Sequence, residues 1–232
     1  PYTVVFEYEL KMVDFGAISA PDWMPQHYHQ SVEKSSFTAY IPQGNTLNSR
    51  ANMLPDPVTS TDGGDQVLKW EVENLPARTW EPEAPPSSQN LPYLHTSLED
   101  FAIGKIKMTN RDWQSFGKQM LQLHEGIRDL PPALAKIVAE TTKNLVSDRD
   151  KINALYRLLQ DRTRYVGVQL GVGGWQPFSA EYVEENRFGD CKALSNYMGA
   201  MLSAVDIESY PVLVYSGEKP FLAVEPDFTA TA

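Results

Sequence analysis

The sequence has one cysteine, four histidines and no block of lysine or arginine among its 232 residues. A single cysteine excludes an internal disulfide framework and a zinc ribbon, because both need several cysteines. Without a basic block we expect no nucleic-acid partner, and an anionic membrane surface is an equally poor partner. No apolar run approaches the roughly 20 residues that span a bilayer, so we expect no membrane insertion.

The chain also lacks a charged and then apolar signal segment at its start, and it begins at Pro1 without a methionine. We therefore expect a trimmed or mature form. Its 42% hydrophobic and 22% charged residues are typical of a folded globular protein. The length suits one large domain or two ordinary ones.

Charge and proline are distributed unevenly along the chain. Residues 1–100 hold 5 Lys/Arg against 14 Asp/Glu and 11 of the 17 prolines, whereas residues 101–232 hold 15 Lys/Arg against 16 Asp/Glu. This contrast predicts two parts of different architecture, a β-rich domain over residues 1–105 and a helix-rich domain over residues 106–232. The acidic first part favours neutral or basic partners over polyanionic glycans.

Strand signals dominate the first part. β-branched and aromatic residues favour strands over residues 2–10, 36–41 and 66–72. The run Asp62-Gly-Gly-Asp65 is typical of a tight turn. Five prolines between residues 76 and 92 predict an extended crossing that is not helical. Strands at this spacing predict an antiparallel sandwich or barrel.

The second part shows helical periodicity first and a mixture of helix and strand afterwards. Polar caps and prolines mark the starts of its first three helices, at Thr109 or Asn110, at Pro131-Pro132, and at Ser147 or Asp148. The first helix is expected to end near Glu125, and the third has an apolar stripe of Ile152, Leu155, Tyr156 and Leu159. Further on we expect strands over 164–170 and 209–215, a glycine-rich turn over 171–177, an acidic helical turn over 181–185 and a helix over 192–205.

Cys191 is the residue with the clearest chemical potential, since it follows Gly189 and Asp190 at the expected start of the last helix. Unpaired backbone N–H groups and the positive dipole at a helix start stabilise a thiolate and can also hold an oxyanion. Gly189 would let the chain turn sharply so that the thiol projects. The alternative is a small buried cysteine beneath the helix, which is the commonest fate of a free cysteine.

The residues around this cysteine have competing interpretations. The stretch 171–174 is not a dinucleotide fingerprint, because no helix opens directly after it, and we expect no cofactor. Its better use is as a flexible cleft wall that presents Trp175. That indole could donate a hydrogen bond or form a platform for substrate, or it could pack in a core. Asp190 is expected to cap the helix rather than to catalyse.

The histidines and the acidic pair offer weaker candidates. His27 and His29 could share one strand face, as a metal site requires, but no cysteine or carboxylate cluster accompanies them. We therefore expect no metal. His124 lies on a mixed helical face and is expected to be solvated or to act as a cap. Glu184 and Glu185 are expected on a solvated face.

Three segments, residues 164–178, 187–192 and 201–214, resemble the bacterial transglutaminase-like family. The most specific of them is Arg187-Phe-Gly-Asp-Cys-Lys192. The family shares a papain-type α+β core, in which a cysteine at a helix start packs against a small antiparallel sheet. Residues 74–86 more weakly resemble a β-rich domain of unknown function that precedes this core in large secreted bacterial proteins. The implied fold is α+β, with a sandwich-like N-terminal domain and a truncated papain/transglutaminase-like core.

The resemblance implies that Cys191 is the nucleophile for hydrolysis or transfer at peptide or amide bonds, with hydrolysis preferred. Trp175, Gln176, Asp190 and Lys192 are then expected to line the substrate and oxyanion site. In the family a histidine and an aspartate follow the cysteine, whereas all four histidines here precede it, namely His27, His29, His95 and His124. We therefore expect the partners beyond Ala232 and an inactive fragment, or else a degenerate member of the family.

The same resemblance implies a peptide or protein substrate, with the cell envelope as one source, and a periplasmic or secreted location. The alternative function is a non-catalytic peptide- or glycan-binding or scaffolding module in which Cys191 is vestigial. A histidine on the next strand, followed by an aspartate, would favour the enzyme. The oligomeric state stays open.

Overall fold

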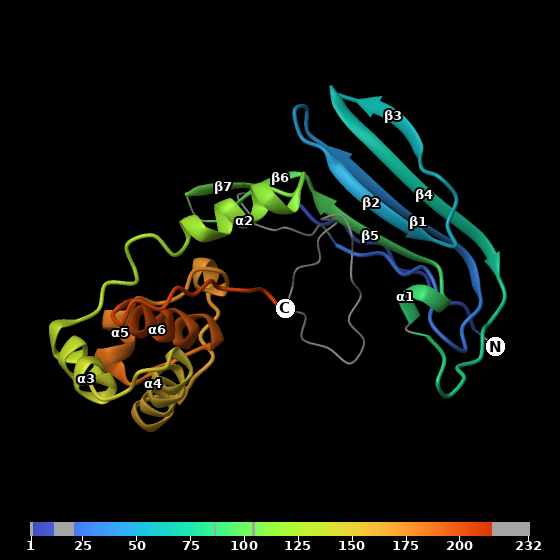
Figure 1. Ribbon diagram of the computed structural model, residues 1–232. Coiled ribbons are helices and arrows are strands. Elements are labelled where there is room, and N and C mark those ends of the chain that lie inside the picture. The colour runs from blue at the N-terminus through green and yellow to red at the C-terminus, as the bar shows by residue number, and fades with distance from the viewer. Residues whose placement is uncertain (1, 12–20, 86, 104, 215–232) are drawn as a thin grey trace.

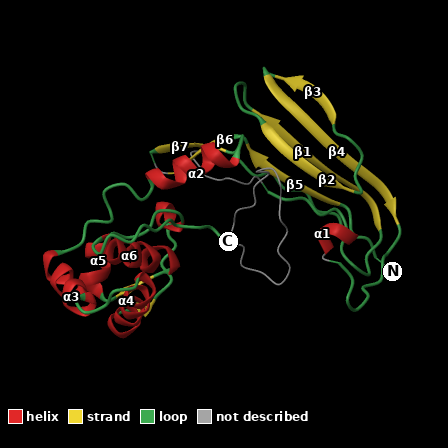
Figure 2. Cartoon of the chain, in the orientation of Figure 1, coloured by secondary structure: helices red, strands yellow, loops and turns green. Residues whose placement is uncertain are grey.

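The computed structural model describes residues 2–11, 21–85, 87–103 and 105–214. The protein is α+β, as the sequence predicts, with antiparallel sheets in the first part and helices in the second (Figure 1). A hairpin and a helix lie between the two parts in the same view, and Figure 2 shows the change from strand to helix along the chain. Within the described residues, no helix combines the length and the apolar character needed to cross a membrane.

The larger sheet has the strand order β1-β4-β3 and is antiparallel throughout. Its strands are β1 (Val32–Ile41), β3 (Val58–Asp62) and β4 (Asp65–Leu75). The strands predicted over 36–41 and 66–72 are therefore present and longer than expected, whereas β3 was not predicted. Gly63 and Gly64 form the turn between β3 and β4 with φ angles of +59° and +100°, which glycine adopts at little cost.

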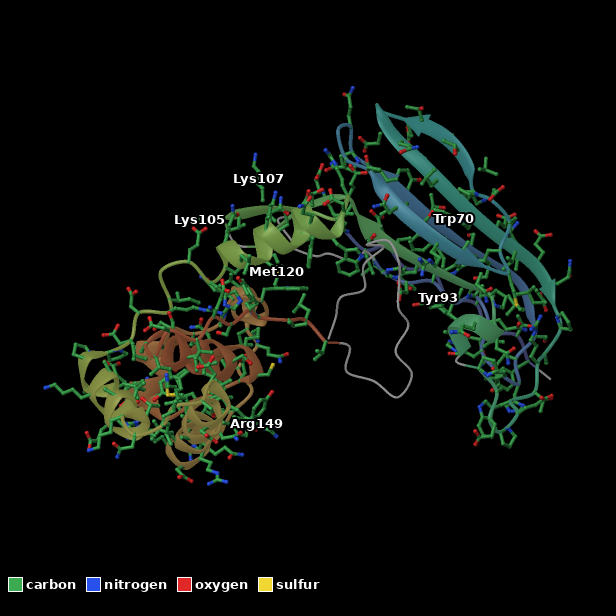
Figure 3. All side chains as sticks on the ribbon, viewed as in Figure 1. Trp70, Tyr93, Lys105, Lys107, Met120 and Arg149 are labelled. Carbon is green, nitrogen blue, oxygen red and sulfur yellow. The ribbon has the colours of Figure 1, made fainter. Side chains whose placement is uncertain are left out.

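A second, two-stranded sheet pairs β2 (Leu47–Asn52) with β5 (Tyr93–Leu98). Trp70 on β4 and Leu94 on β5 share one buried core with Ile41 and Leu68, so the two sheets pack against each other. Trp70, labelled in Figure 3, is only 1% exposed. The first part is thus sandwich-like.

Two expectations for the first part are wrong. Residues 2–11 contain no strand, and side chains such as Val5 and Phe6 are 89% and 80% exposed. The segment has strand-forming residues but no neighbouring strand to pair with among the described residues, so its β-propensity alone does not form a strand. The crossing over 76–92 is not free of helix, because Ser87–Asn90 form the short helix α1. That segment contains no proline, so nothing prevents a helical turn there.

The hairpin of β6 (Asp100–Ile103) and β7 (Ile106–Thr109) leads into α2 (Trp113–Gln122). Asp112 caps α2 by accepting a hydrogen bond from the Ser115 N–H at 2.6 Å. Asn110 does not cap it, because its side chain is buried and donates to the Leu98 carbonyl at 2.6 Å. The predicted domain boundary between residues 105 and 106 falls between the two strands of this hairpin, and the division into domains stays a prediction.

The second part packs α3 (Pro132–Thr142), α4 (Asp148–Arg162), α5 (Ala180–Asn186) and α6 (Cys191–Ser203) around one core. The predicted Ser147 cap is confirmed, since its hydroxyl accepts a hydrogen bond from the Asp150 N–H at 3.1 Å. The core is formed by buried side chains of all four helices, among them Leu134, Val138, Leu155, Leu159, Val183, Tyr197 and Met201.

Some predicted details of the second part differ. Of the strand predicted over 164–170, only β8 (Arg164–Tyr165) forms, and residues 209–214 form no strand. Only half of the predicted stripe of α4 is buried, because Ile152 and Tyr156 are 38% and 53% exposed. Leu155 and Leu159, with the partly buried Leu158, supply the contact of this helix with the core.

A polar cluster joins the segment before β1 to the β5 strand. Asp22 accepts hydrogen bonds from the Tyr93 hydroxyl and pairs with His95 Nδ1 at 2.5 Å. Backbone hydrogen bonds between Trp23 and Leu94 extend this contact. Burial acts to raise the pKa of Asp22, but hydrogen bonds from His95 and Tyr93 outweigh it and lower the pKa below its usual value.

We expect Asp22→Asn to lower the free energy of unfolding by about 1–2 kcal/mol at pH 7, since the charged acceptor is lost. Because the pKa of Asp22 is lower in the folded state, its contribution is present above the unfolded value of 3.8 and is lost as the pH falls below it. The difference in the free energy of unfolding between wild type and Asp22→Asn should therefore become smaller at acidic pH. Urea titrations at several pH values measure it, with Asp56→Asn at an exposed loop position as the control. A constant difference down to pH 3 would contradict the assignment.

Candidate functional site

Cys191 is the first residue of α6, and its thiol is free and exposed. Asp190 precedes it in extended backbone, and its carboxylate accepts a hydrogen bond from the Ala193 N–H at 2.9 Å. The predicted cap is therefore confirmed. The interpretation of Cys191 as a buried packing residue is wrong, because the side chain lies at the surface beside the positive end of the helix dipole.

The segment before Cys191 is held by a short parallel bridge. β9 (Phe188–Gly189) pairs with β8, with hydrogen bonds from the Arg164 N–H to the Arg187 carbonyl at 3.0 Å and from the Val166 N–H to the Gly189 carbonyl at 2.9 Å. Arg187 ends α5 with a left-handed φ of +61°. The chain therefore passes from α5 to α6 in four residues, of which Arg187 and Gly189 make backbone hydrogen bonds and Asp190 caps α6.

Gly189 is required here by close packing rather than by an unusual backbone angle. A Cβ atom at this position would lie 2.9 Å from the Ala193 Cβ and 3.4 Å from side-chain atoms of Leu194 and Val183. Its φ is outside the left-handed region. The glycine thus lets the strand lie directly against the first turn of α6, and the sharp turn predicted for it is not the reason.

Lys192 forms an ion pair with the carboxylate of Asp190, which caps α6. Its Nζ lies 2.5 Å from Asp190 Oδ2, and the side chains of the two residues are 18% and 2% exposed. The predicted role of both residues in substrate or oxyanion binding stays a prediction. The structure adds that the two charges meet directly beside the thiol-bearing residue.

Glu184 is buried, so its predicted place on a solvated face is wrong. One carboxylate oxygen accepts from Arg162 Nη2 at 2.6 Å, and the other accepts from Arg187 Nη1 at 2.8 Å and from the Tyr197 hydroxyl at 2.5 Å. These partners belong to α4, to the end of α5 and to α6. We call Glu184, Arg162, Arg187 and Tyr197 the Glu184 network, which ties α4, α5 and α6 together.

Electrostatics in the Glu184 network follow from burial and pairing. Burial acts to raise the pKa of Glu184, but the Tyr197 hydroxyl and the Arg162 guanidinium outweigh it, so the pKa lies below its usual value. Burial and the adjacent carboxylate raise the pKa of Tyr197. The carboxylate therefore stays ionised and accepts, and the phenol stays protonated and donates.

Trp175 packs against the unit formed by β6, β7 and α2. Its segment is a 3-10 helix over Gly171–Gly174, and the indole contacts a core that contains Phe101, Met108 and Phe116. Met120, also packed in this core, lies on the side of α2 that faces the helical part, whereas Lys107 projects outward from the hairpin (Figure 3). Packing therefore accounts for the burial of Trp175, and a further role for it and Gln176 toward substrate stays a prediction.

The histidines lie elsewhere. His95 belongs to the Asp22 cluster, and His27 and His29 lie in or beside a turn rather than on one strand face, with His29 at φ +63°. Among the described residues, no histidine is hydrogen-bonded to the Cys191 thiol, and no three His, Cys, Asp or Glu side chains form a group that could hold a metal.

His124 is half-buried beside α6, so the prediction of a solvated or capping residue is wrong. Its ring contacts Asn196, whose side chain also donates to the Ile127 carbonyl at 2.9 Å. Burial and, to a smaller degree, the Arg128 guanidinium lower the pKa of His124. Its Nδ1 atom is buried with no hydrogen-bond partner among the described residues.

Comparison with known proteins supports the fold and part of the resemblance. A family described as a domain of unknown function with a solved structure (DUF3857) matches residues 1–79, which confirms the predicted resemblance of the first part to a domain of unknown function. The comparison with curated proteins finds no match. The transglutaminase-like resemblance of the second part is not tested by either finding.

A solved structure is similar in fold to most of the chain. The crystal structure of a protein described as a putative protease from Parabacteroides distasonis is similar with a TM-score of 0.54 and 16% sequence identity. The match covers 81% of this chain and 35% of that protein, so the chain spans about a third of its length. At this identity the likeness shows a common fold, which extends over strands and helices alike.

Proposed function

We propose that this chain carries the nucleophile of a transglutaminase-like cysteine hydrolase that acts on peptide or amide bonds. The observation that carries the proposal is the placement of Cys191. It is an exposed thiol at the first position of α6, held by the Asp190 cap and the β8–β9 bridge. The fold likeness to a protein described as a putative protease supports the same reaction class.

The proposed reaction begins when the Cys191 thiolate attacks the carbonyl carbon of an amide bond. A C–S bond forms, and the carbonyl oxygen takes the negative charge, which backbone N–H groups at the start of α6 can stabilise. The C–N bond then breaks, and the amine leaves with a proton from a general acid. Water attacks the resulting thioester, which releases the acid and restores the thiol. No metal or cofactor takes part in these steps.

The base and the group that orients it are proposed to come from sequence outside these 232 residues. The support is that no histidine among the described residues is hydrogen-bonded to the thiol. Trp175, Gln176 and Lys192 are proposed to border the substrate site, and the substrate is proposed to be a peptide or protein met in the periplasm or outside the cell. We expect the 232-residue chain alone to show negligible amide hydrolysis.

Activity of the full-length protein tests the proposal. With a casein or fluorogenic peptide substrate, Cys191→Ala should reduce turnover at least 1,000-fold, which is on the order of the loss seen when a covalent nucleophile is removed. Ser195→Ala, at an exposed position one turn further along α6, should retain turnover within about twofold. Turnover that survives Cys191→Ala would reject the proposal, and its complete absence with every peptide and amide substrate would favour a binding module.

A further inference from the structure

We propose that Lys192 is a positioning residue that cancels the charge of Asp190 beside the Cys191 thiolate. The pair is close and poorly hydrated, with Nζ 2.5 Å from Oδ2 and side chains 18% and 2% exposed. In this pair Lys192 acts on the thiolate through Asp190. This inference rests on the proposed function only for the role of the thiolate as a nucleophile, since the effect of the charges on the thiol does not depend on catalysis.

A negative cap has two opposite effects at this helix start. The Asp190 carboxylate stabilises α6 by accepting from the Ala193 N–H at 2.9 Å. The same charge, on the residue next to Cys191, disfavours a second negative charge on the sulfur. The other carboxylate oxygen is the one that meets Lys192, so the lysine removes the second effect and leaves the first intact.

The test measures the rate of alkylation by iodoacetamide against pH, and the single cysteine makes every event assignable. Lys192→Met should raise the pH midpoint of alkylation by about one unit, because the Asp190 charge is then uncompensated. Asp190→Asn should lower it, since asparagine still caps the helix while the lysine charge remains. The double variant should return to within about 0.3 units of wild type, as should Lys192→Arg, which keeps the charge.

The opposite directions of the two midpoint shifts distinguish an effect of charge on the thiol from a loss of structure at the start of α6. If the two residues only stabilised the start of α6, both single variants would shift the alkylation midpoint in the same direction, and the double variant would show the largest shift. The charged and titratable groups on the elements that pack against α6 are the same in every variant; they include Arg162 of α4, Glu181, Tyr182, Glu184 and Glu185 of α5, Arg187, and Arg164 and Tyr165 of β8.

Two outcomes would overturn the proposal: an unchanged or lowered midpoint for Lys192→Met, or shifts of one sign in both single variants. Far-UV circular dichroism and thermal unfolding accompany each variant. If Lys192→Met does not fold, Asp190→Asn and the double variant still carry the comparison, because neither leaves a buried unpaired carboxylate. Failure of the proposed hydrolase in the full-length protein would leave these shifts unaffected, so the two proposals can fail separately.

Discussion

Glu184→Gln is expected to lower the free energy of unfolding by about 3 kcal/mol, the largest effect on stability predicted for this chain. The substitution keeps the size of the side chain but removes the charge that pairs with Arg162 and Arg187 at 2.6 and 2.8 Å. The Arg162 side chain is 22% exposed and would remain charged without its carboxylate. Breaking one partner of a buried pair costs more than the pair contributes, because the other charge stays desolvated.

Chemical unfolding followed by circular dichroism measures this effect, and Glu185→Gln is the matched control. Glu185 is the next residue on α5 and is exposed, so its substitution should change stability by less than about 0.5 kcal/mol. Because the pKa of Glu184 is lowered in the folded state, its contribution holds above the unfolded value of 4.5 and is lost as the pH falls below it. Equal effects of the two substitutions would contradict the network.

The Glu184 network also shows what the sequence could and could not predict. The spacing of Glu184 and Arg187 is visible on one helix, yet the two other partners, Arg162 and Tyr197, lie on different helices. The local sequence shows that a helix is charged and therefore favours an exposed position for its glutamates. Whether one of these charges is buried depends on which other helices pack against it. A glutamate on a short acidic helix therefore looks solvated until the packing is known.

Local signals with one dominant physical cause were predicted well. Ser147 and Asp190 cap their helices as expected, because a side-chain oxygen at that position satisfies N–H groups within three residues. The turn at Gly63 and Gly64 is likewise set by backbone freedom alone. At the candidate site, the local sequence predicts that Cys191 lies at the start of α6, but it does not predict the ion pair of Asp190 and Lys192 beside it.

Signals that need a distant partner were predicted poorly. The β-prone segment 2–10 and the segment 209–214 have the composition of strands, yet neither is paired with a neighbour among the described residues. Trp175 has distant partners that its local sequence does not reveal, since it packs against a hairpin and a helix more than fifty residues earlier in the chain. Tertiary contact, not propensity, decides these positions.

Gly189→Ala is the second large effect, with an expected loss of about 2–3 kcal/mol in the free energy of unfolding. The new methyl group would lie 2.9 Å from the Ala193 Cβ, a distance that neither atom can relieve by rotating. Either β9 or the first turn of α6 must move, so the rate of Cys191 alkylation at pH 7 should change as well. The control is Gly117→Ala in the middle of α2, where nothing lies within 4 Å of the added carbon. That substitution should raise stability by about 0.5–1 kcal/mol, because alanine favours helix over glycine.

A double variant identifies the contact responsible. Ala193→Gly removes the opposing methyl group and on its own should cost about 2 kcal/mol, from helix propensity and from the loss of a buried methyl group. Combined with Gly189→Ala, it should restore part of the lost stability, so the double variant is more stable than the sum of the single effects predicts. The alkylation rate should return toward wild type in the same variant, since β9 can again lie against α6. Strict additivity of the two substitutions would show that Gly189 is needed for another reason, and that the Asp190 cap and the β8–β9 bridge alone hold Cys191 at the start of α6.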